Sequence, residues 1–193
     1  MRSAAWRRKR GWQSWIGRTA PIALPRVALA LALAPAACGH SEALDNGVLH
    51  KDGLLVALGP VPEGWRPLRI AGADVAFRDP QRDGSALFDV HCDRRDDDAP
   101  LSALTGHLIM GTTEREIELE ETVPFDGREA LHTRMRAKLD GVPMQYDIYV
   151  MKKDGCVYDL VYVAPPARFA EGAADFERFA LALHAHARGA ASP

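Results

Sequence analysis

The sequence has few of the features that mark specialised protein classes. Among its 193 residues only three are cysteine, and aromatic residues make up 7%. Three cysteines exclude a disulfide-dense miniprotein, and the one pronounced apolar run, Val27 to Ala34, is too short for the roughly 20 residues that cross a bilayer. Hydrophobic residues at 47% and charged residues at 26% exclude a disordered or collagen-like chain and predict one ordinary folded domain.

The familiar catalytic motifs are also absent. The chain has no G-x-S-x-G, H-E-x-x-H, P-loop or G-x-G-x-x-G motif, and no C-x-x-C pair for thiol redox chemistry. Its serines lie in no nucleophile context, and its many carboxylates suggest no particular acid–base pair. We therefore expect a protein that is not an enzyme, with no catalytic residue and no cofactor.

The formal net charge of −2 averages two unlike parts. Residues 1–37 hold seven basic residues and no acidic one, so 17 basic and 26 acidic residues remain afterwards, a formal charge of −9. A basic segment, a short apolar run and small residues are typical of a secretory signal peptide, predicted here at 1–37. The acidic remainder has no basic cluster to neutralise phosphates, so we expect no nucleic-acid partner.

The end of this signal resembles the lipobox of bacterial lipoproteins, since Ala36-Ala37 precedes Cys38. That resemblance implies that Cys38 is lipidated, for example with palmitate, and becomes the first residue of the mature chain. Gly39 after it resembles the default for delivery to the outer membrane, on its periplasmic side. The alternative is a plain secretory signal in which Cys38 is an ordinary cysteine.

Hydrophobic periodicity predicts one α+β domain at 53–188, after a lipidated tether at 38–52 and before a tail at 189–193. A helix is expected from Leu101 to Gly111, and a C-terminal helix through Phe176, Phe179, Ala180 and Leu183. Asp-Gly pairs between alternating runs indicate hairpins. The fold class is an antiparallel β-sheet of about six strands flanked by helices, with strands near 73–78, 85–92, 112–123, 128–139, 142–153 and 156–164.

The hairpin turns also predict the strand register. Two-residue turns place Arg134 opposite Asp147 and His132 opposite Tyr149, and the next hairpin places Asp147 opposite Tyr162. A three-residue turn centred on Asp126 would place Glu120, Glu118, Glu116 and Glu114 opposite His132, Arg134, Arg136 and Lys138, a match of opposite charges.

This register gives the sheet two unlike faces. The aliphatic face is expected to form the main core, and it holds Ile117, Leu119, Leu131, Met135, Ile148, Val150, Val157, Val161 and Val163. The other face grades from charged to aromatic, and a helix covering its aromatic part is the favoured interpretation. If any face binds a partner, the candidate residues are Arg134, Arg136, Asp147, Tyr149, Tyr158 and Tyr162.

From Gly64 to Phe179 the order of elements resembles the Mog1/PsbP-like fold. The resemblance lies in Val75–Pro80, Gly127–Ala130, Leu139–Pro143, Gly155–Leu160 and Asp175–Phe179. It implies an antiparallel sheet flanked by helices and a non-catalytic role in binding or assembly.

The cysteine count fits one anchor plus one pair. With Cys38 lipidated, Cys92 and Cys156 are expected to form a disulfide in an oxidising compartment, the alternative being two buried thiols. His91 with other histidines matches no zinc spacing, and no D-x-D-x-D-G calcium loop is present, so no metal site is predicted.

The sequence thus predicts a non-enzymatic cell-envelope lipoprotein, attached to a membrane by its lipid and binding or assembling an unknown envelope protein. The alternatives are a small-ligand-binding periplasmic protein, which would show an apolar cavity between sheet and helix, and a hydrolase with an unrecognised site, which would show a deep polar pocket.

Overall fold

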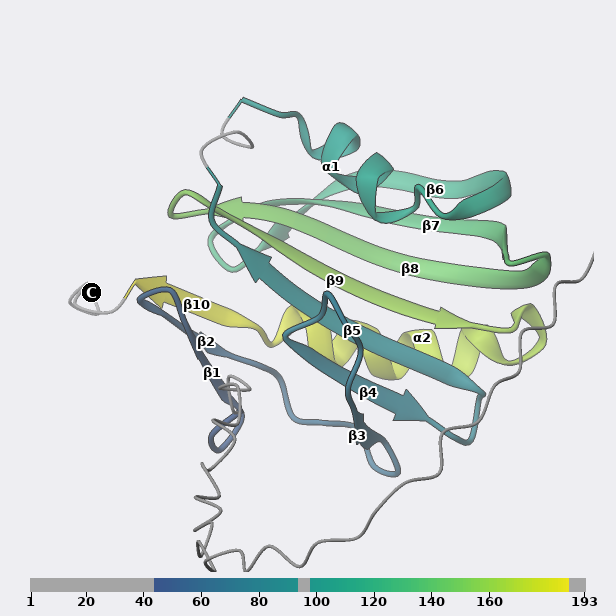
Figure 1. The fold of residues 1–193 in the computed structure, drawn as a ribbon, viewed down its shortest axis with the longest axis horizontal. Helices are drawn as coiled ribbons and strands as arrows, with labels where there is room; N and C mark the ends of the chain where they lie inside the picture. The colour runs from purple at the N-terminus through teal and green to yellow at the C-terminus, as the bar shows by residue number, and fades with distance from the viewer. Residues whose placement is uncertain (1–43, 94–97, 188–193) are drawn as a thin grey trace, which may run out of the picture. The chain divides into compact units, whose positions relative to one another are not determined.

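The computed structural model describes residues 44–93 and 98–187. The predicted signal peptide at 1–37, Cys38 and the predicted tail at 189–193 lie outside the described residues. The main element is a seven-stranded antiparallel sheet in the order β3-β4-β5-β9-β8-β7-β6 (Figure 1). Its strands are β3 Arg66–Leu68, β4 Val75–Asp79, β5 Gly84–His91, β6 Thr112–Phe125, β7 Arg128–Leu139, β8 Val142–Lys153 and β9 Cys156–Ala164.

Two of the predicted hairpins are confirmed in full. The turn residues Asp140 and Asp154 have φ of +49° and +55°, and each is followed by a glycine that also has positive φ. Asp and Gly tolerate this left-handed conformation at low cost. As predicted, Arg134 pairs with Asp147, and Asp147 pairs with Tyr162.

The predicted register between β6 and β7 is wrong except near Glu116, which does face Arg136. The turn has two residues rather than three, so that Phe125 faces Arg128, and two register shifts interrupt the ladder. Such bulges insert an extra residue and are invisible in a pattern of alternation. The charges still meet: Glu118 lies 2.7 Å from Arg136 and Glu114 lies 2.7 Å from Lys138.

One helix packs on each face of the sheet. Helix α1 (Leu101–Leu108) covers the aliphatic side chains of β7 and β8, and α2 (Pro166–Leu181) covers the aromatic side (Figure 1). The larger core lies under α2, where Tyr149 and Tyr162 pack against Phe176. The expectation that the aliphatic face forms the main core is therefore wrong, and Ile117 on it is 48% exposed.

A second sheet of three strands was not predicted. It has the order β1-β2-β10 and consists of β1 Val48–Lys51, β2 Leu54–Ala57 and β10 His184–Ala187. Strand β1 falls inside the segment predicted as a tether, and Leu49 in it is fully buried. Leu183, expected in the C-terminal helix, follows it instead. Neither helix of the described chain is long and apolar enough to cross a membrane.

Candidate ligand-binding groove

The partner face predicted from the sequence is mostly covered by α2. Asp147, Tyr149, Tyr158 and Tyr162 are at most 2% exposed. Tyr149 and Tyr162 pack against Phe176 of α2, and Tyr158 belongs to the same apolar core. The prediction therefore fails for these four residues. The side chains of Arg134 and Arg136 are 33% and 52% exposed, so only these two remain open to a partner.

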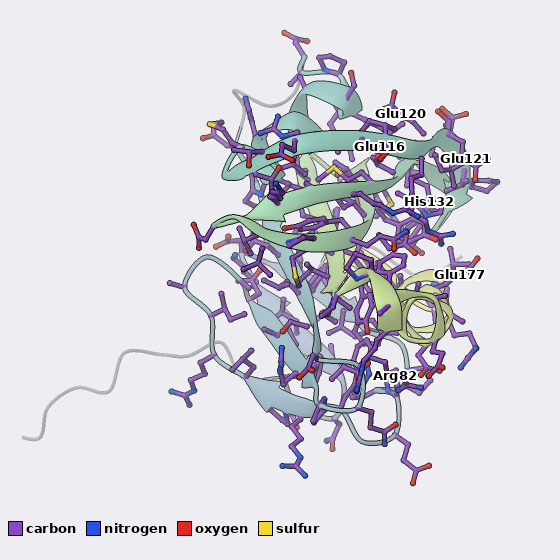
Figure 2. All side chains as sticks on the ribbon, turned by 90° about the vertical axis from the view of Figure 1, so that its right-hand side faces the viewer. Arg82, Glu116, Glu120, Glu121, His132 and Glu177 are labelled. Atoms are coloured by element: carbon purple, nitrogen blue, oxygen red, sulfur yellow. A yellow bond between two sulfur atoms is a disulfide. The ribbon has the colours of Figure 1, made fainter. Side chains whose placement is uncertain are left out.

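Asp147 is instead the centre of a buried polar network. It accepts a hydrogen bond of 2.8 Å from Arg134 Nη2, and its other oxygen lies 2.5 Å from His132 Nε2. Burial opposes the charge of Arg134, but the hydrogen bond and charge of Asp147 outweigh it and raise the pKa of the guanidinium. His132 lies between the acidic edge strand β6 and Glu177 of α2 (Figure 2). We interpret this network as structural, because it ties β7 to β8 and satisfies the buried carboxylate.

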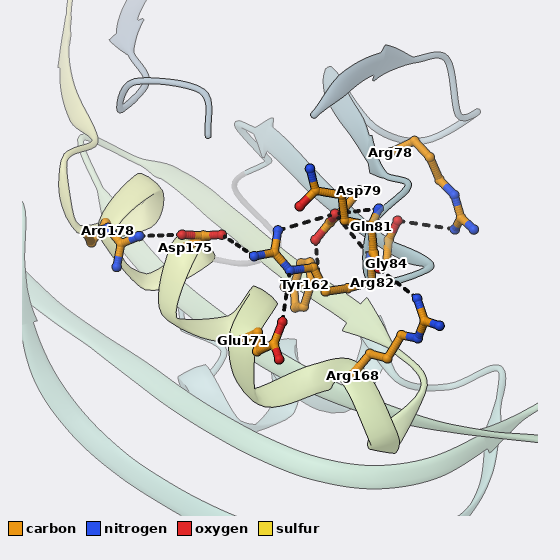
Figure 3. A network of polar contacts seen from close by, with 10 residues as sticks. All are labelled: Arg78, Asp79, Gln81, Arg82, Gly84, Tyr162, Arg168, Glu171, Asp175 and Arg178. Atoms are coloured by element: carbon orange, nitrogen blue, oxygen red, sulfur yellow. Dashed lines mark hydrogen bonds and ion pairs between the residues drawn. The ribbon is translucent and has the colours of Figure 1, made fainter. Parts of the chain in front are cut away.

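A second polar network fastens α2 to the β4–β5 turn (Figure 3). Buried Asp79 accepts a 3.0 Å hydrogen bond from the Tyr162 hydroxyl. Arg82, in the turn, forms ion pairs with Asp79 and with Asp175 of α2, and its Nη2 lies 3.3 Å from Asp175 Oδ2. Arg168 of α2 donates to the backbone oxygen of Gln81 at 2.8 Å. These contacts explain why the aromatic face is closed.

The predicted pairing of Cys92 with Cys156 is present as a disulfide. Cys92 follows β5, and Cys156 begins β9, the neighbour of β5 in the sheet. The sequence separation is 64 residues, so the bond closes a long loop and joins the two strands at one end.

The opposite face of the sheet has an open groove of about 410 Å³ beside α1. Leu87 of β5 forms the floor of the groove together with Val161 and Val163 of β9. Leu108, at the end of α1, and Ile70, from the β3–β4 connection, also line the groove. Helix α1 packs on β7 and β8, and the groove lies beside it over β5 and β9. The groove lies in the volume range typical of small-molecule sites, which are concave and mostly apolar.

One end of this apolar groove is acidic. Asp89 and Asp159 face each other across β5 and β9 and both line the groove. Burial raises the pKa of Asp89, the nearby carboxylate of Asp74 adds to the increase, and Lys51 and His91 oppose it. Neither residue was predicted as a site residue, although each carboxylate stands at an otherwise apolar position of an alternating strand.

Among the residues that the structure describes, the side chains best placed to hold a cation lie at this acidic end. Ligand atoms of Asp89, His91 and Asp159 all lie within 4.8 Å of one another. His91 Nδ1 is 3.3 Å from Asp89 and 3.9 Å from Asp159. The structure thus brings His91 to two aspartates rather than to the other histidines weighed in the sequence.

At the other end the groove is lined by Tyr146, which is 6% exposed. Its hydroxyl oxygen has no hydrogen-bond partner among the residues that the structure describes. Burial raises the pKa of this phenol, and the charge of Asp140 adds to the effect. An unsatisfied buried hydroxyl costs free energy.

Comparisons by sequence identify no relative. No family model matches the chain, and no curated protein matches it.

Solved structures do share its architecture. The chain resembles LpqN of Mycobacterium tuberculosis, described as involved in cell envelope biogenesis, at 13% identity and a TM-score of 0.52, over 70% of this chain and 86% of that one. A Bacteroides thetaiotaomicron protein matches at 12% identity and a TM-score of 0.50, over 73% of this chain and 48% of that one. The cyanobacterial PsbP of Synechocystis is 17% identical with a TM-score of 0.49, over 70% and 88%.

These likenesses concern the fold alone. The antiparallel sheet with a helix on each face, which the resemblance to the Mog1/PsbP-like fold predicts, is confirmed, and LpqN shares this architecture.

Proposed function

We propose that the protein is a non-enzymatic binding protein of the bacterial cell envelope that holds an apolar ligand in the groove beside α1. The observation that supports the proposal is the groove itself, an apolar concavity of about 410 Å³ between a helix and the sheet. This is the feature expected of a small-ligand binder rather than of a hydrolase, whose site would be polar.

The arrangement of polar side chains also favours binding over catalysis. Ser85 lines the groove, and His91 is on the same strand. Six residues of a β-strand span about 20 Å, so this serine and histidine cannot form the hydrogen-bonded nucleophile–base pair that acyl transfer needs.

The envelope location rests on the sequence and on one structural likeness. The lipobox-like Ala36-Ala37-Cys38 supports a lipid anchor in the outer membrane with the domain on the periplasmic side. LpqN, which shares the fold, is described as involved in cell envelope biogenesis. A groove binder on a lipid tether would hold its ligand close to a membrane surface.

Ligand binding is tested with the full chain carrying Cys38→Ala, which removes the anchor and keeps every described residue. The neutral fluorescent probe Nile red is titrated and then displaced with decanol. We expect saturable binding that Leu87→Trp weakens at least about tenfold, because the indole fills the groove floor. Ile117→Trp, on the exposed edge strand β6, is the matched control and should bind like the parent. Absence of saturable binding, or equal binding by both variants, would overturn the proposal.

The anchor is tested separately by metabolic labelling with a palmitate analogue. We expect label on the wild-type protein in the membrane fraction and none on Cys38→Ala. Equal labelling of the two proteins, or none on either, would contradict a lipid on Cys38.

A further inference from the structure

The groove is bordered by the most exposed apolar side chains of the described chain. Met110, after α1, is 67% exposed and Val142, at the start of β8, is 56% exposed, more than any other large apolar side chain among the described residues. Leu108 and Leu139, which line the groove, are 39% and 41% exposed. We call these four side chains the apolar rim. Single exposed apolar residues are ordinary on a protein surface, but a group of them marks a surface that binds something.

Backbone pairing brings the members of the apolar rim together. Leu139 of β7 pairs directly with Val142 of β8 and with the first residue of β6, which follows Met110 by two positions. Direct partners lie on the same face of a sheet, so Val142 is on the groove side with Leu139. The pairing of β8 with β9 begins only at Gln145, so residues 142–144 extend past the end of β9 (Figure 1). The apolar surface of the groove therefore continues onto a projecting hairpin end.

The apolar rim has no net charge to select its partner. The two segments that carry it, 108–115 and 138–142, together hold two basic and two acidic side chains, which are Arg115, Lys138, Glu114 and Asp140. Lys138 Nζ lies 2.7 Å from Glu114, and Arg115 donates to the backbone oxygens of Ile109 and Met110. The partner is therefore selected by burial of the apolar side chains rather than by charge.

A lipid bilayer is the partner that these features fit. An apolar ligand of the groove resides in a membrane rather than in water, because each methylene group exposed to water costs free energy. A rim that touches the bilayer beside the groove lets such a ligand move between the two without entering water. Binding at a bilayer interface scales with buried apolar area, so the two separate tips, the loop after α1 and the β7–β8 turn, need no matching surface there.

We infer that the apolar rim docks on the surface of a phospholipid bilayer, with Met110 and Val142 inserted and the groove beside the lipid. The inference rests on the proposed function, since it states where the groove takes up and delivers its ligand. It does not require the lipid on Cys38, which would only keep the domain near that surface.

Docking is tested with a fluorophore on the apolar rim of the full chain. Cys38→Ala removes the anchor, and Cys92 and Cys156 are joined, so Val142→Cys supplies the one free thiol for an environment-sensitive nitrobenzoxadiazole label. Phosphatidylcholine vesicles should raise the emission of this label and shift it to shorter wavelength, because the label moves from water into lipid.

Two further variants make the test specific. Leu181→Cys, 49% exposed at the end of α2 on the other face of the sheet, is the matched control, and its label should not respond. Residues 1–43 are identical in both proteins, so any vesicle binding through them contributes equally to both. In the position-142 protein, Met110→Ser should raise the lipid concentration for half-maximal emission about three- to tenfold, because a polar side chain replaces an inserted apolar one. All three positions are exposed, so these substitutions leave the core intact.

Three results would overturn the inference: no rise at position 142, equal rises at positions 142 and 181, or a rise that Met110→Ser leaves unchanged. A signal at position 142 that increases with protein concentration in the absence of vesicles would assign the apolar rim to a contact between two copies of the chain instead. Nile red titration of the unlabelled protein without vesicles tests the groove separately. Absence of binding there overturns the proposed function, whereas binding without a response at position 142 overturns the inference alone.

Discussion

The Tyr162 hydroxyl donates a 3.0 Å hydrogen bond to Oδ2 of Asp79 by passing between two glycines. A side chain on Gly84 of β5 or on Gly172 of α2 would overlap the phenol oxygen. The bond gives the buried carboxylate a donor, and the two glycines let α2 approach the sheet closely.

Gly172→Ala is expected to destabilise the protein by about 2 kcal/mol or more, because the added methyl group meets the Tyr162 hydroxyl in a packed core. Helix propensity alone would favour alanine by about 1 kcal/mol. Gly106→Ala in α1 is the matched control, since a methyl group there meets nothing within 4 Å, and it should be neutral or stabilising. Urea denaturation of both variants measures the difference, and a loss of the same size in both would contradict the packing argument.

Removing one hydroxyl from either of two buried tyrosines should change stability in opposite directions. Tyr162→Phe takes the donor away from Asp79 and should cost about 1–3 kcal/mol, since the carboxylate stays buried. Tyr146→Phe removes a hydroxyl without a partner among the described residues and should gain about 1 kcal/mol. Thermal unfolding of the ligand-free protein measures both changes in stability. Destabilisation by Tyr146→Phe would mean that the Tyr146 hydroxyl has a hydrogen-bond partner.

Asp126 should make stability depend on pH in the acid range. Burial alone would raise the pKa of Asp126, but hydrogen bonds from Lys153, the Ala185 backbone N–H and His184 lower the pKa below the ordinary value of an aspartate. A lowered folded pKa contributes stability that is present above the unfolded pKa and is lost as pH falls through the folded one.

Asp126→Asn should therefore cost about 1–2 kcal/mol near neutral pH, and its difference from wild type should shrink below about pH 4. Asparagine tolerates the positive φ of this turn, so backbone strain is not expected. Asp154→Asn, at the equivalent position of the β8–β9 hairpin, should show little change. Chemical denaturation from pH 7 to pH 3 provides the measurement, and a constant difference over this range would refute the assignment.

Reduction of the Cys92–Cys156 disulfide should destabilise the domain by about 4 kcal/mol in the chain-entropy model, given the 64-residue separation. Non-reducing mass spectrometry of periplasm-derived protein should find these two cysteines linked. The double substitution Cys92→Ala and Cys156→Ala should lower the melting temperature to that of the reduced wild type. Free thiols at both positions would show that the bond does not form in the cell.

The hairpins were predictable because their signals are local. Asp140-Gly141 and Asp154-Gly155 adopt the positive φ that two-residue turns require, and the turn length then sets every pair along the strands. The β6–β7 register was not predictable, because its bulges depend on how the edge strand bends rather than on alternation. The three-stranded sheet was missed because its short strands lie at the two ends of the domain and need each other as partners.

The candidate site was even less accessible to sequence reasoning. Leu87, Val161 and Val163 look like ordinary core positions, and only the incomplete cover of the sheet by α1 turns them into a groove. Conversely, Tyr149 and Tyr162, which were predicted as partner contacts, are buried because α2 is amphipathic and packs Phe176 against them.

By itself, the sequence determined the local features: the basic N-terminal segment, the alternating strands, the Asp-Gly turns and a cysteine count that fits one pair. These depend on residues close together in the chain, where backbone conformational preference and periodicity act directly. Only the tertiary structure decided which face of the sheet each helix covers, and therefore that Tyr162 is buried while Leu87 lines a groove that ends at Asp89 and Asp159. The position of each helix is set by the burial of apolar surface between distant parts of the chain. Because this driving force is non-directional, the position is decided only when all the elements pack around the same core.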